Sequence, residues 1–398
     1  MRIAYILADP GIAVGGTKGA SIHVAEVCRA FRGSGAEVLL LAMRAAGPAP
    51  PEVRMVHVDP GPLASDAWGE LDRVQACERF LTQIEPALTE FRPELIYERL
   101  ALFCPGTAVL AAKLGALRVV EVNAPVAQER SRHFGLVHRS LAESMEWRSL
   151  TGATVVAVSE QMARWSAGRG AVATKVIANG VDPHRFTGPE VSEAGAALRQ
   201  HLGLATSEVV GFAGSLKPWH GVEILLEAIE QLAPRRPSLR LLLVGDGPGR
   251  AVCQTRASQG VAKERVVFTG AVEYDSMPAH LAAFDIATAP YLGEDGFYFS
   301  PLKIVEAMAA AKPVVASRMG PIEILLGDTG VLVAPGQPAA LAQALAALLD
   351  DPGQSERLGR AARQRAESSL TWDAVVEKIL AFTRDQTFPS RQPLEIMR

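Results

Sequence analysis

The chain has 398 residues, of which 48% are hydrophobic and 21% are charged, with 35 glycines and 26 prolines. This composition excludes a disordered chain, a collagen-like repeat and a charged tail, and the length predicts two or three domains of roughly 100–200 residues each. The formal net charge of −3 argues against nucleic acid as the main partner.

The N-terminal segment MRIAYILADPG has a short apolar stretch that is followed by Asp and Pro, so it predicts a buried strand and no targeting segment. No apolar run reaches the roughly 18–20 residues that a membrane span needs. The cysteines form no CxxC pair and are too few to staple a chain this long, so we expect reduced thiols in a cytoplasmic protein. They are Cys28, Cys77, Cys104 and Cys253.

Short runs rich in Val, Ile and Leu alternate with segments of helical period in the first half. The predicted strands are Arg2–Leu7, Glu37–Met43, Val53–Val58, Leu95–Tyr97, Val119–Val122, Thr154–Val158 and Lys175–Ile177. The predicted helices are Ile22–Arg32, Leu71–Phe91 and Ala127–Ser149. Apolar strands separated by helices indicate a parallel sheet that is covered on both faces.

The same pattern restarts in the second half. Its predicted strands are Val209–Ala213, Leu239–Val244, Val266–Phe268, Ile286–Ala289 and Val314–Ala316. Its predicted helices are Gly221–Leu232, Arg250–Gln259, Met277–Ala283, Leu302–Ala310, Pro338–Leu349, Gln354–Ser368 and Trp372–Thr383. Two successive βα series predict an α/β protein with two doubly wound, Rossmann-like domains.

The segment Gly180–Ala196 has no clear period and is the predicted domain boundary. We expect an N-terminal domain over residues 1–185, a C-terminal domain over 186–371 and a last segment over 372–398. Two such domains facing each other would leave a cleft at the carboxyl ends of their strands, where ligands bind in open α/β sheets.

Glycines occur where the predicted strands lead into helices. Gly15 and Gly16 follow the first strand, and glycines there let a ligand anion approach a helix N-terminus, although a flexible turn is an equal alternative. The segment is not GxGxxG, so the dinucleotide fingerprint is absent. Gly245 follows a later strand, and the adjacent Asp246 is expected to cap the following helix.

The loop GSLKPWHG at residues 214–221 combines glycine, cations and the start of a helix, which predicts a phosphate cradle. Lys217 is the expected phosphate cation and His220 a second donor, with Trp219 a packing residue.

A second loop leads into the predicted helix at residue 302. Ser300 fits the N-cap of this helix and Pro301 its first position. Lys303 and Glu306 share one face, which indicates either an ion pair that stabilises the helix or a ligand anion at the N-terminus with a sugar hydroxyl on the glutamate.

Polar residues also end strands in the first half. Glu98 and Arg99 either face the cleft or form a surface pair, and Glu121 and Asn123 end the next strand. No HExxH, DxD, GxSxG or Walker pattern is present, so no metal site is expected.

Together these motifs resemble the GT-B glycosyltransferases, specifically glycosyltransferase family 4, over nearly the whole chain. The motifs are the N-terminal GG with KGASIHVAEVCRAFRGSGAEV, then VIANGVDPHRF, GFAGSLKPWHGVEILLEAI, LLLVGDGP, VVFTGAV, SPLKIVEAMAAAKPVVAS and GVLVAPGQPAAL. The resemblance implies a retaining, metal-independent transfer from a nucleotide sugar, with the donor on the second domain and the acceptor on the first. It also implies that segment 372–398 returns to the first domain.

The resemblance assigns roles to single residues. Glu306 matches the glutamate that binds the ribose hydroxyls, and the Phe268–Val272 loop matches the base-binding strand end. The diphosphate is expected near Gly15, Gly16 and the N-terminus of the predicted helix at 302. The full set expected at the donor is Gly15, Gly16, Ser215, Lys217, His220, Gly245, Asp246, Val272, Tyr298, Phe299, Ser300, Pro301, Leu302, Lys303 and Glu306.

This sequence departs from the family pattern at three points. Ser215 and His220 stand where many members have Arg and Lys, and Tyr298 stands where a second glutamate is common. We interpret this as a relocation of charge, in which Lys217 and Lys303 replace the missing cations around the diphosphate. Tyr298, Phe299 and Ser300 would then shape the sugar subsite.

Many members also carry a histidine near the end of a first-domain strand, and none lies around Asn123. His23 and His133 are the candidate substitutes. The residues expected on the acceptor side are His23, Glu98, Arg99, Asn123 and His133.

The prediction is therefore a hexosyltransferase-type enzyme that uses a UDP- or GDP-sugar and no cofactor. Its acceptor is a small molecule, a glycan or a lipid-linked hydroxyl, with peripheral contact at the inner membrane face as one variant and a monomer or homodimer as its assembly. The alternatives are a nucleotide-sugar epimerase or hydrolase, and a non-catalytic nucleotide-sugar-binding protein.

Overall fold

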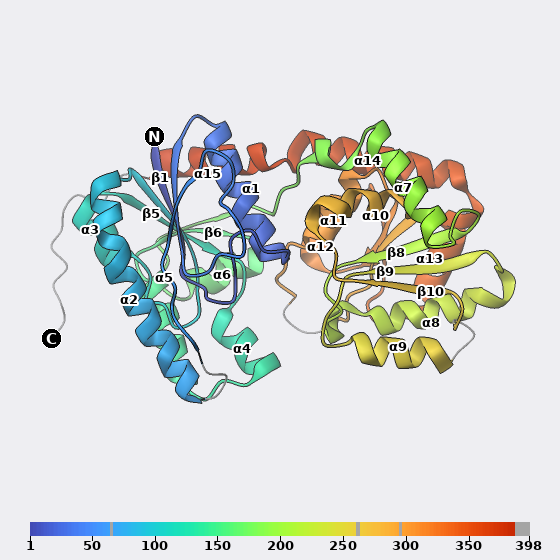
Figure 1. Ribbon diagram of the computed structural model, residues 1–398, viewed down its shortest axis with the longest axis horizontal. Coiled ribbons are helices and arrows are strands. Elements are labelled where there is room, and N and C mark those ends of the chain that lie inside the picture. Colours follow the sequence, from blue (N-terminus) through green and yellow to red (C-terminus); the bar gives the residue numbers. More distant parts are fainter. Residues whose placement is uncertain (64–66, 260–262, 294–296, 387–398) are drawn as a thin grey trace. The chain divides into compact units, whose positions relative to one another are not determined.

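The computed structural model describes residues 1–63, 67–259, 263–293 and 297–386 (Figure 1). The chain forms two compact units, one of Met1–Ala178 with the C-terminal segment that begins at Trp372, and one of Asn179–Thr371. The division follows Ala178 and not residue 185, because the next residues pack on the second unit. There the Val181 N–H donates to the Leu370 carbonyl at 2.8 Å, and the Phe186 ring lies edge-on to Tyr274.

The first unit contains an all-parallel sheet in the order β3-β2-β1-β4-β5-β6-β7 in its described part. Its strands are β1 (Arg2–Leu7), β2 (Glu37–Ala42), β3 (Arg54–His57), β4 (Leu95–Arg99), β5 (Leu117–Val122), β6 (Thr154–Ala157) and β7 (Ala173–Val176). Its helices are α1 (Gly19–Gly33), α2 (Ala67–Phe91), α3 (Ala108–Leu114), α4 (Val126–Phe134), α5 (Arg139–Leu150), α6 (Glu160–Ala167) and α15 (Trp372–Arg384).

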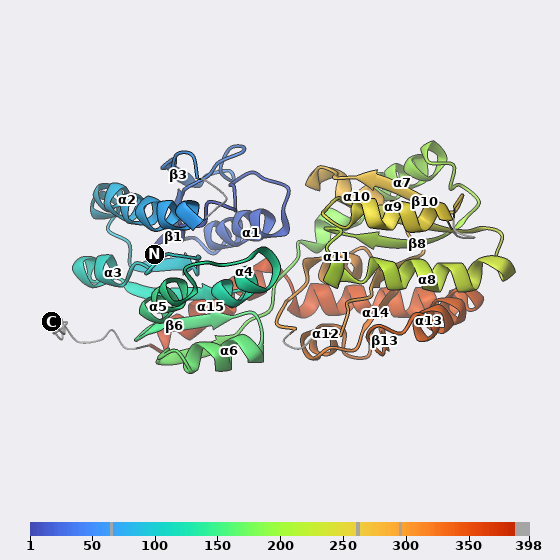
Figure 2. The same cartoon turned by 90° about the horizontal axis from the view of Figure 1, so that it is seen from below.

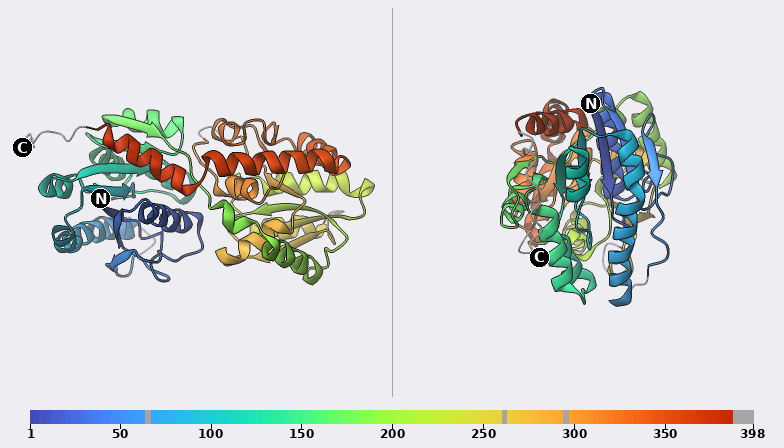
Figure 3. Two further views of the ribbon diagram at one scale, coloured as in Figure 1. Left: turned by 90° about the horizontal axis from the view of Figure 1, so that it is seen from above. Right: turned by 90° about the vertical axis from the view of Figure 1, so that its left-hand side faces the viewer.

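Helices cover both faces of this sheet. Ile6 and Ile96 pack on one face against Phe80 of α2. On the other face, the ring of Tyr97 lies 5.4 Å from that of Phe31 in α1. Helix α15 packs beside α1 on this unit (Figure 3).

The second unit repeats this arrangement with the order β10-β9-β8-β11-β12-β13, again all parallel in its described part. Its strands are β8 (Glu208–Ala213), β9 (Leu239–Val244), β10 (Val266–Gly270), β11 (Ile286–Ala289), β12 (Val314–Ser317) and β13 (Val331–Val333). Its helices are α7 (Pro189–His201), α8 (Val222–Leu232), α9 (Arg250–Gln259), α10 (Met277–Ala282), α11 (Leu302–Ala309), α12 (Gly320–Leu326), α13 (Pro338–Asp350) and α14 (Pro352–Ser369).

The core of this unit lies between the sheet and α8, α9 and α13. Phe212 and Leu241 pack there with Leu225 of α8 and Leu345 of α13. Figure 2 shows α8 and α9 in front of the strands. Helices α10 and α11 lie on the opposite side of the sheet (Figure 1).

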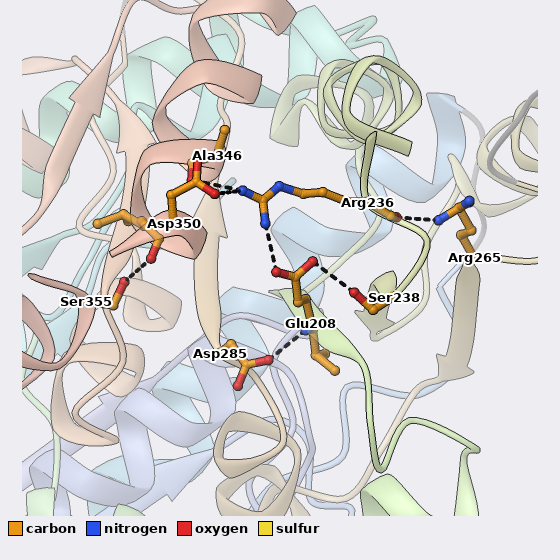
Figure 4. Close-up of polar contacts among 10 residues, drawn as sticks. Glu208, Arg236, Ser238, Arg265, Asp285, Ala346, Asp350 and Ser355 are labelled. Carbon is orange, nitrogen blue, oxygen red and sulfur yellow. Dashed lines mark hydrogen bonds and ion pairs between the residues drawn. The ribbon is translucent and has the colours of Figure 1, made fainter. Parts of the chain in front are cut away.

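Polar contacts join the elements at the amino-terminal ends of these strands (Figure 4). Arg236 donates to Glu208 of β8 at 2.7 Å and pairs with Asp350 at the end of α13. Arg265 donates to the Arg236 carbonyl at 2.7 Å. This network lies at the amino-terminal ends of the strands, so it is separate from the residues at their carboxyl ends.

The structure corrects two predicted segments. The predicted helix Ala127–Ser149 is two helices, α4 and α5, because Gly135 takes a φ of +78° that ends α4. The segment Gly180–Ala196, predicted as an irregular boundary, contains the start of α7. This helix packs closely at Gly195, where a Cβ would lie 2.6 Å from the Ala282 Cβ. Because a glycine and not a large apolar residue is buried there, the sequence shows no apolar period for this helix.

The four cysteines are buried and unpaired. None of the helices in the described ranges is both long enough and apolar enough to cross a membrane.

Candidate functional site

Both sheets share one topological feature, a point where the strand order reverses. It lies between β1 and β4 in the first unit and between β8 and β11 in the second. In open α/β sheets, ligands bind outside the carboxyl ends of the strands at this switch point. The two switch points are therefore the places where candidate residues are expected to meet.

Two glycines pack the loops of the second unit tightly at its switch point. Gly214, which follows β8, has a φ of +139°, and a Cβ there would lie 2.9 Å from Lys303 Nζ. Gly221 has a φ of +70°, and a Cβ there would lie 1.8 Å from the carbonyl oxygen of Pro290, which follows β11. A larger residue at Gly221 would push the loop away from the Pro290 backbone, whereas at Gly214 it would displace only the end of the Lys303 side chain.

The Lys303 side chain, in the first turn of α11, ends between aromatic rings. Its Nζ lies 4.1 Å from the centroid of the Phe212 ring and 5.1 Å from that of Tyr291. The Nζ is shielded from solvent and has no hydrogen-bond partner among the described residues. Burial lowers the pKa of Lys303 to about 7, while Glu306 opposes this shift and Lys217 adds to it.

His220 differs from its predicted role as a second phosphate donor. Its Nδ1 lies against the Ser215 carbonyl oxygen, which can only accept, so Nδ1 carries the proton. Burial lowers the pKa of His220 to about 2, helped by Lys303 and Lys217 and opposed by the bond to Ser215. The ring is therefore neutral, and its Nε2 is an acceptor.

Ser300 is not the N-cap of α11. The Asn179 N–H donates to Ser300 Oγ at 2.9 Å, and Asn179 Nδ2 donates to the Ser300 carbonyl at 2.6 Å. Helix α11 begins at Leu302, its flanking residue is Pro301, and no side chain caps it. The serine hydroxyl thus fixes the loop to the start of the second unit and leaves the first N–H groups of α11 uncapped.

The aromatic residues before α11 pack on one another. Tyr298 is 9% exposed, and its ring lies 4.3 Å from that of Phe299. Glu306 is 8% exposed and follows Lys303 by one turn of α11. Of the aromatic pair, Phe299 is the more accessible.

Three predicted donor residues lie on the neighbouring strand ends. The Gly245 N–H donates to the Gly270 carbonyl at 2.9 Å. Asp246 accepts from the Gly247 N–H and from Arg250 in the first turn of α9, and these contacts lower its pKa. Val272 follows β10 and is half-buried.

In the first unit, the switch point is organised by Glu121 of β5, which is 1% exposed. Its carboxylate accepts from Tyr5 at 3.0 Å, from Asn123 at 2.8 Å and from Arg99 at 3.5 Å, and it contacts His23 Nε2. Burial raises the pKa of Glu121, but His23, Arg99 and Asn123 outweigh it and hold the pKa at about 2. The structure thus brings three predicted acceptor-side residues together around an ionised carboxylate.

The other predicted residues of this unit have separate environments. Glu98 and Arg99 do not form a surface pair: Glu98 accepts from the Thr107 N–H at 2.8 Å and pairs with Arg118. His133 lies on α4 with its ring beside Phe134.

The glycines after β1 have a local packing role. Gly15 has a φ of +72°, and a Cβ there would lie 2.7 Å from the Gly47 Cα, so the loop needs glycine at this position to pack on its neighbour. Gly16 N–H donates to the Ala13 carbonyl at 3.1 Å. Both glycines precede α1, the helix that carries His23.

Sequence reasoning did not place Glu121, Tyr5, Phe212, Tyr291 or Asn179 in a site. A signal existed for Glu121, which lies in the same strand-end motif as Asn123. The sequence contains no such signal for Phe212 and Tyr291, because a buried aromatic residue at a strand end usually indicates packing alone. In the described part of the chain, no three His, Cys, Asp or Glu side chains gather to hold a metal ion.

We expect Glu121→Gln to destabilise the protein in a pH-dependent way. A carboxyl whose pKa falls from 4.5 to about 2 on folding adds about 3 kcal/mol, present above pH 4.5 and lost as the pH falls towards 2. The variant should therefore differ most from the wild type at pH 6 and least near pH 3. Urea unfolding at pH 6, 4 and 3 measures this, with Glu90→Gln as an exposed control; a difference that does not change with pH would contradict it.

Two family models match the chain, "Glycosyltransferase Family 4" over residues 17–185 and "Glycosyl transferases group 1" over 207–351. Among curated proteins, the chain is 35% identical to the GDP-mannose-dependent alpha-(1-6)-phosphatidylinositol monomannoside mannosyltransferase of Mycolicibacterium smegmatis, covering 48% of this chain and 51% of that one. It is 33% identical to the D-inositol 3-phosphate glycosyltransferase of Corynebacterium diphtheriae, covering 51% and 48%. The chain spans about half the length of the curated relatives it matches.

Solved structures share the fold over nearly the whole chain. The structure of Anabaena HepE in complex with UDP-glucose has a TM-score of 0.71 at 22% identity, covering 97% of this chain and 100% of that one. The structure of WaaG, a glycosyltransferase involved in lipopolysaccharide biosynthesis, has a TM-score of 0.71 at 16% identity, covering 96% and 100%.

Proposed function

The chain belongs to the GT-B glycosyltransferases of family 4, and from this premise we propose that it transfers a sugar from a nucleoside diphosphate sugar to an acceptor hydroxyl. The observation that carries the proposal is the position of Lys303. Its amine lies at the β8–β11 switch point, the place where a sheet of this topology binds ligands, and Glu306 lies on the same helix. The donor is a UDP- or GDP-sugar, since a relative is GDP-mannose-dependent and a protein of the same fold binds UDP-glucose.

The donor role of each group follows from its chemistry. When the bond between the sugar and the diphosphate breaks, negative charge develops on the leaving phosphate. Lys303 and Lys217 supply cationic groups for this charge, and the uncapped N–H groups of α11 add hydrogen-bond donors. Glu306 accepts from the ribose hydroxyls, and the strand end at Val272 receives the base.

We infer retention from the family resemblance, and the two lysines support a reaction without a metal ion. The positive charge that a divalent cation supplies to a diphosphate in other enzymes comes here from two lysines. His220 lies in the same loop as Lys217. Its neutral ring has an acceptor nitrogen, which is suited to receive a hydrogen bond from a hydroxyl of the donor sugar.

The acceptor site is proposed at the Glu121 cluster of the first unit. Glu121 holds His23, Arg99 and Asn123 in place, and the last two come from the carboxyl ends of adjacent strands. Such a set of donors fits a polyhydroxylated or anionic acceptor. A small molecule, a glycan and a lipid-linked hydroxyl share this chemistry.

Calorimetric titration with UDP, GDP, ADP and dTDP, with EDTA in place of metal, tests the proposal. We expect one nucleotide to bind, which identifies the base and narrows the donor sugars to be assayed with acceptors. If no nucleotide binds to the folded protein, the donor site is lost. Conversion of the donor sugar at equal rates with and without acceptor would instead indicate an epimerase or a hydrolase.

A further inference from the structure

A charged lysine needs acceptors, and Lys303 has none in the described structure. An ammonium group carries three donors and no acceptor. The Nζ of Lys303 is shielded from water, faces two aromatic rings and makes no hydrogen bond. Aromatic faces attract a cation, but they do not replace the hydrogen bonds that it loses on leaving water.

Each element packed against this amine contributes titratable groups that face it. The loop after β8 contributes Lys217, and His220 in the same loop is neutral. Glu306, on the amine's own helix, is the negative group acting on it. Tyr291, after β11, stays un-ionised because burial raises its pKa. The pKa of about 7 at Lys303 agrees with this balance, in which burial prevails.

Lys312, just beyond the same helix, shows how the fold holds a lysine with a structural role. Its Nζ donates to the Ala282 carbonyl at 2.9 Å and to the Phe284 carbonyl at 2.7 Å. Lys303 differs from Lys312 because its amine is buried without a bond. A packed amine in that state is suited to a ligand that brings acceptor oxygens.

We propose that at slightly alkaline pH Lys303 is a neutral amine in the free protein and takes up one proton from solvent when the diphosphate of a nucleoside diphosphate binds. This inference rests on the proposed donor site. The diphosphate supplies the acceptor oxygens that Lys303 lacks and adds negative charge to that of Glu306, so the cation forms together with the complex. The bound state then contains a new N–H···O bond to phosphate, and the proton comes from the buffer.

The expected proton uptake follows from the titration of one group. With a pKa of about 7 in the free protein, the amine is about half neutral at pH 7 and about nine-tenths neutral at pH 8. Binding should therefore take up about 0.5 proton at pH 7 and about 0.9 at pH 8. Nucleotide affinity should fall as the pH rises above 7. The terminal phosphate, whose second pKa is about 6, is almost fully ionised at pH 8 and does not account for this uptake.

Calorimetry with UDP and GDP in Tris and in HEPES at equal pH and ionic strength measures the uptake, because the observed enthalpy changes with the ionisation enthalpy of the buffer. Lys303→Arg should bind with no uptake, since guanidinium stays charged, and Lys303→Met should bind more weakly with no uptake. Lys113→Met, which changes an exposed lysine of α3, should keep the wild-type uptake.

Tight binding with the same enthalpy in both buffers at pH 8 would overturn the inference and leave the proposed donor site standing. Uptake that persists in Lys303→Met would assign the proton to another group and would also overturn it. If neither nucleotide binds to the folded wild type, the proposed donor class fails, and this inference fails with it.

Discussion

Replacing Lys303 with alanine is expected to lower the turnover number by about 10²–10³-fold, the effect of removing one group that stabilises charge in a transition state. Lys303 is the cation that α11 brings to the carboxyl end of β8, where the leaving diphosphate is proposed to lie. Its neighbours Ser215 and His220 supply no positive charge, because one is a serine and the other a neutral ring. Lys217 is then the remaining cation of this loop.

Steady-state rates with the donor identified by calorimetry measure this effect. The amine makes no hydrogen bond in the described structure, so its removal breaks none, and the variant is expected to fold. Lys303→Met, which keeps most of the side-chain volume between Phe212 and Tyr291, separates the loss of charge from the loss of packing. Near-normal turnover in a folded Lys303→Met protein would show that the diphosphate is stabilised by other groups.

Glu306→Gln is expected to weaken nucleotide binding by roughly 10–100-fold, because hydrogen bonds to a charged group contribute about 1.5–3 kcal/mol. Glu306 is buried on α11, one turn beyond Lys303, so it faces little competing water. Glutamine keeps the shape of the side chain and loses its charge. Titration of the variant with the nucleotide that binds the wild type provides the dissociation constant.

The ribose role of Glu306 has a specific control. A 2′-deoxynucleoside diphosphate should bind the wild type more weakly, and Glu306→Gln should then cost less affinity than it does with the ribonucleotide, since both changes remove the bond to the 2′-hydroxyl. Equal losses in the ribose and deoxyribose series would assign Glu306 to Lys303 and not to the nucleotide, because Glu306 also raises the pKa of that lysine. An unchanged dissociation constant would exclude both roles.

The sequence predicted most of the elements because buried parallel strands are apolar throughout. Strands β1, β9 and β11 and helix α9 have the predicted bounds. Elements that pack through small residues were missed, and α7 with its buried Gly195 is an example. The domain boundary was predicted at residue 185, but it follows Ala178. The residues after Ala178 pack on the second unit through contacts with residues far along the chain, which local sequence does not show.

The types of residue in the site were also readable from the sequence. Local pattern alone indicates the glycines after β8, the cations of the 214–221 loop and the Lys303–Glu306 spacing on one helix face. These features depend on neighbours within a few positions, where turn geometry and helix period decide the conformation.

The tertiary structure decided which of these residues meet. Asn179 and Ser300 are 121 positions apart, and their bonds removed Ser300 from its predicted cap. Lys303 reaches Gly214 because β8 and β11 are neighbours at the switch point, and Glu121 collects Tyr5, His23, Arg99 and Asn123 because β1, β4 and β5 are adjacent. Strand order is set by how crossover helices bury their apolar faces on both sides of the sheet, a property of the whole domain that no local pattern contains.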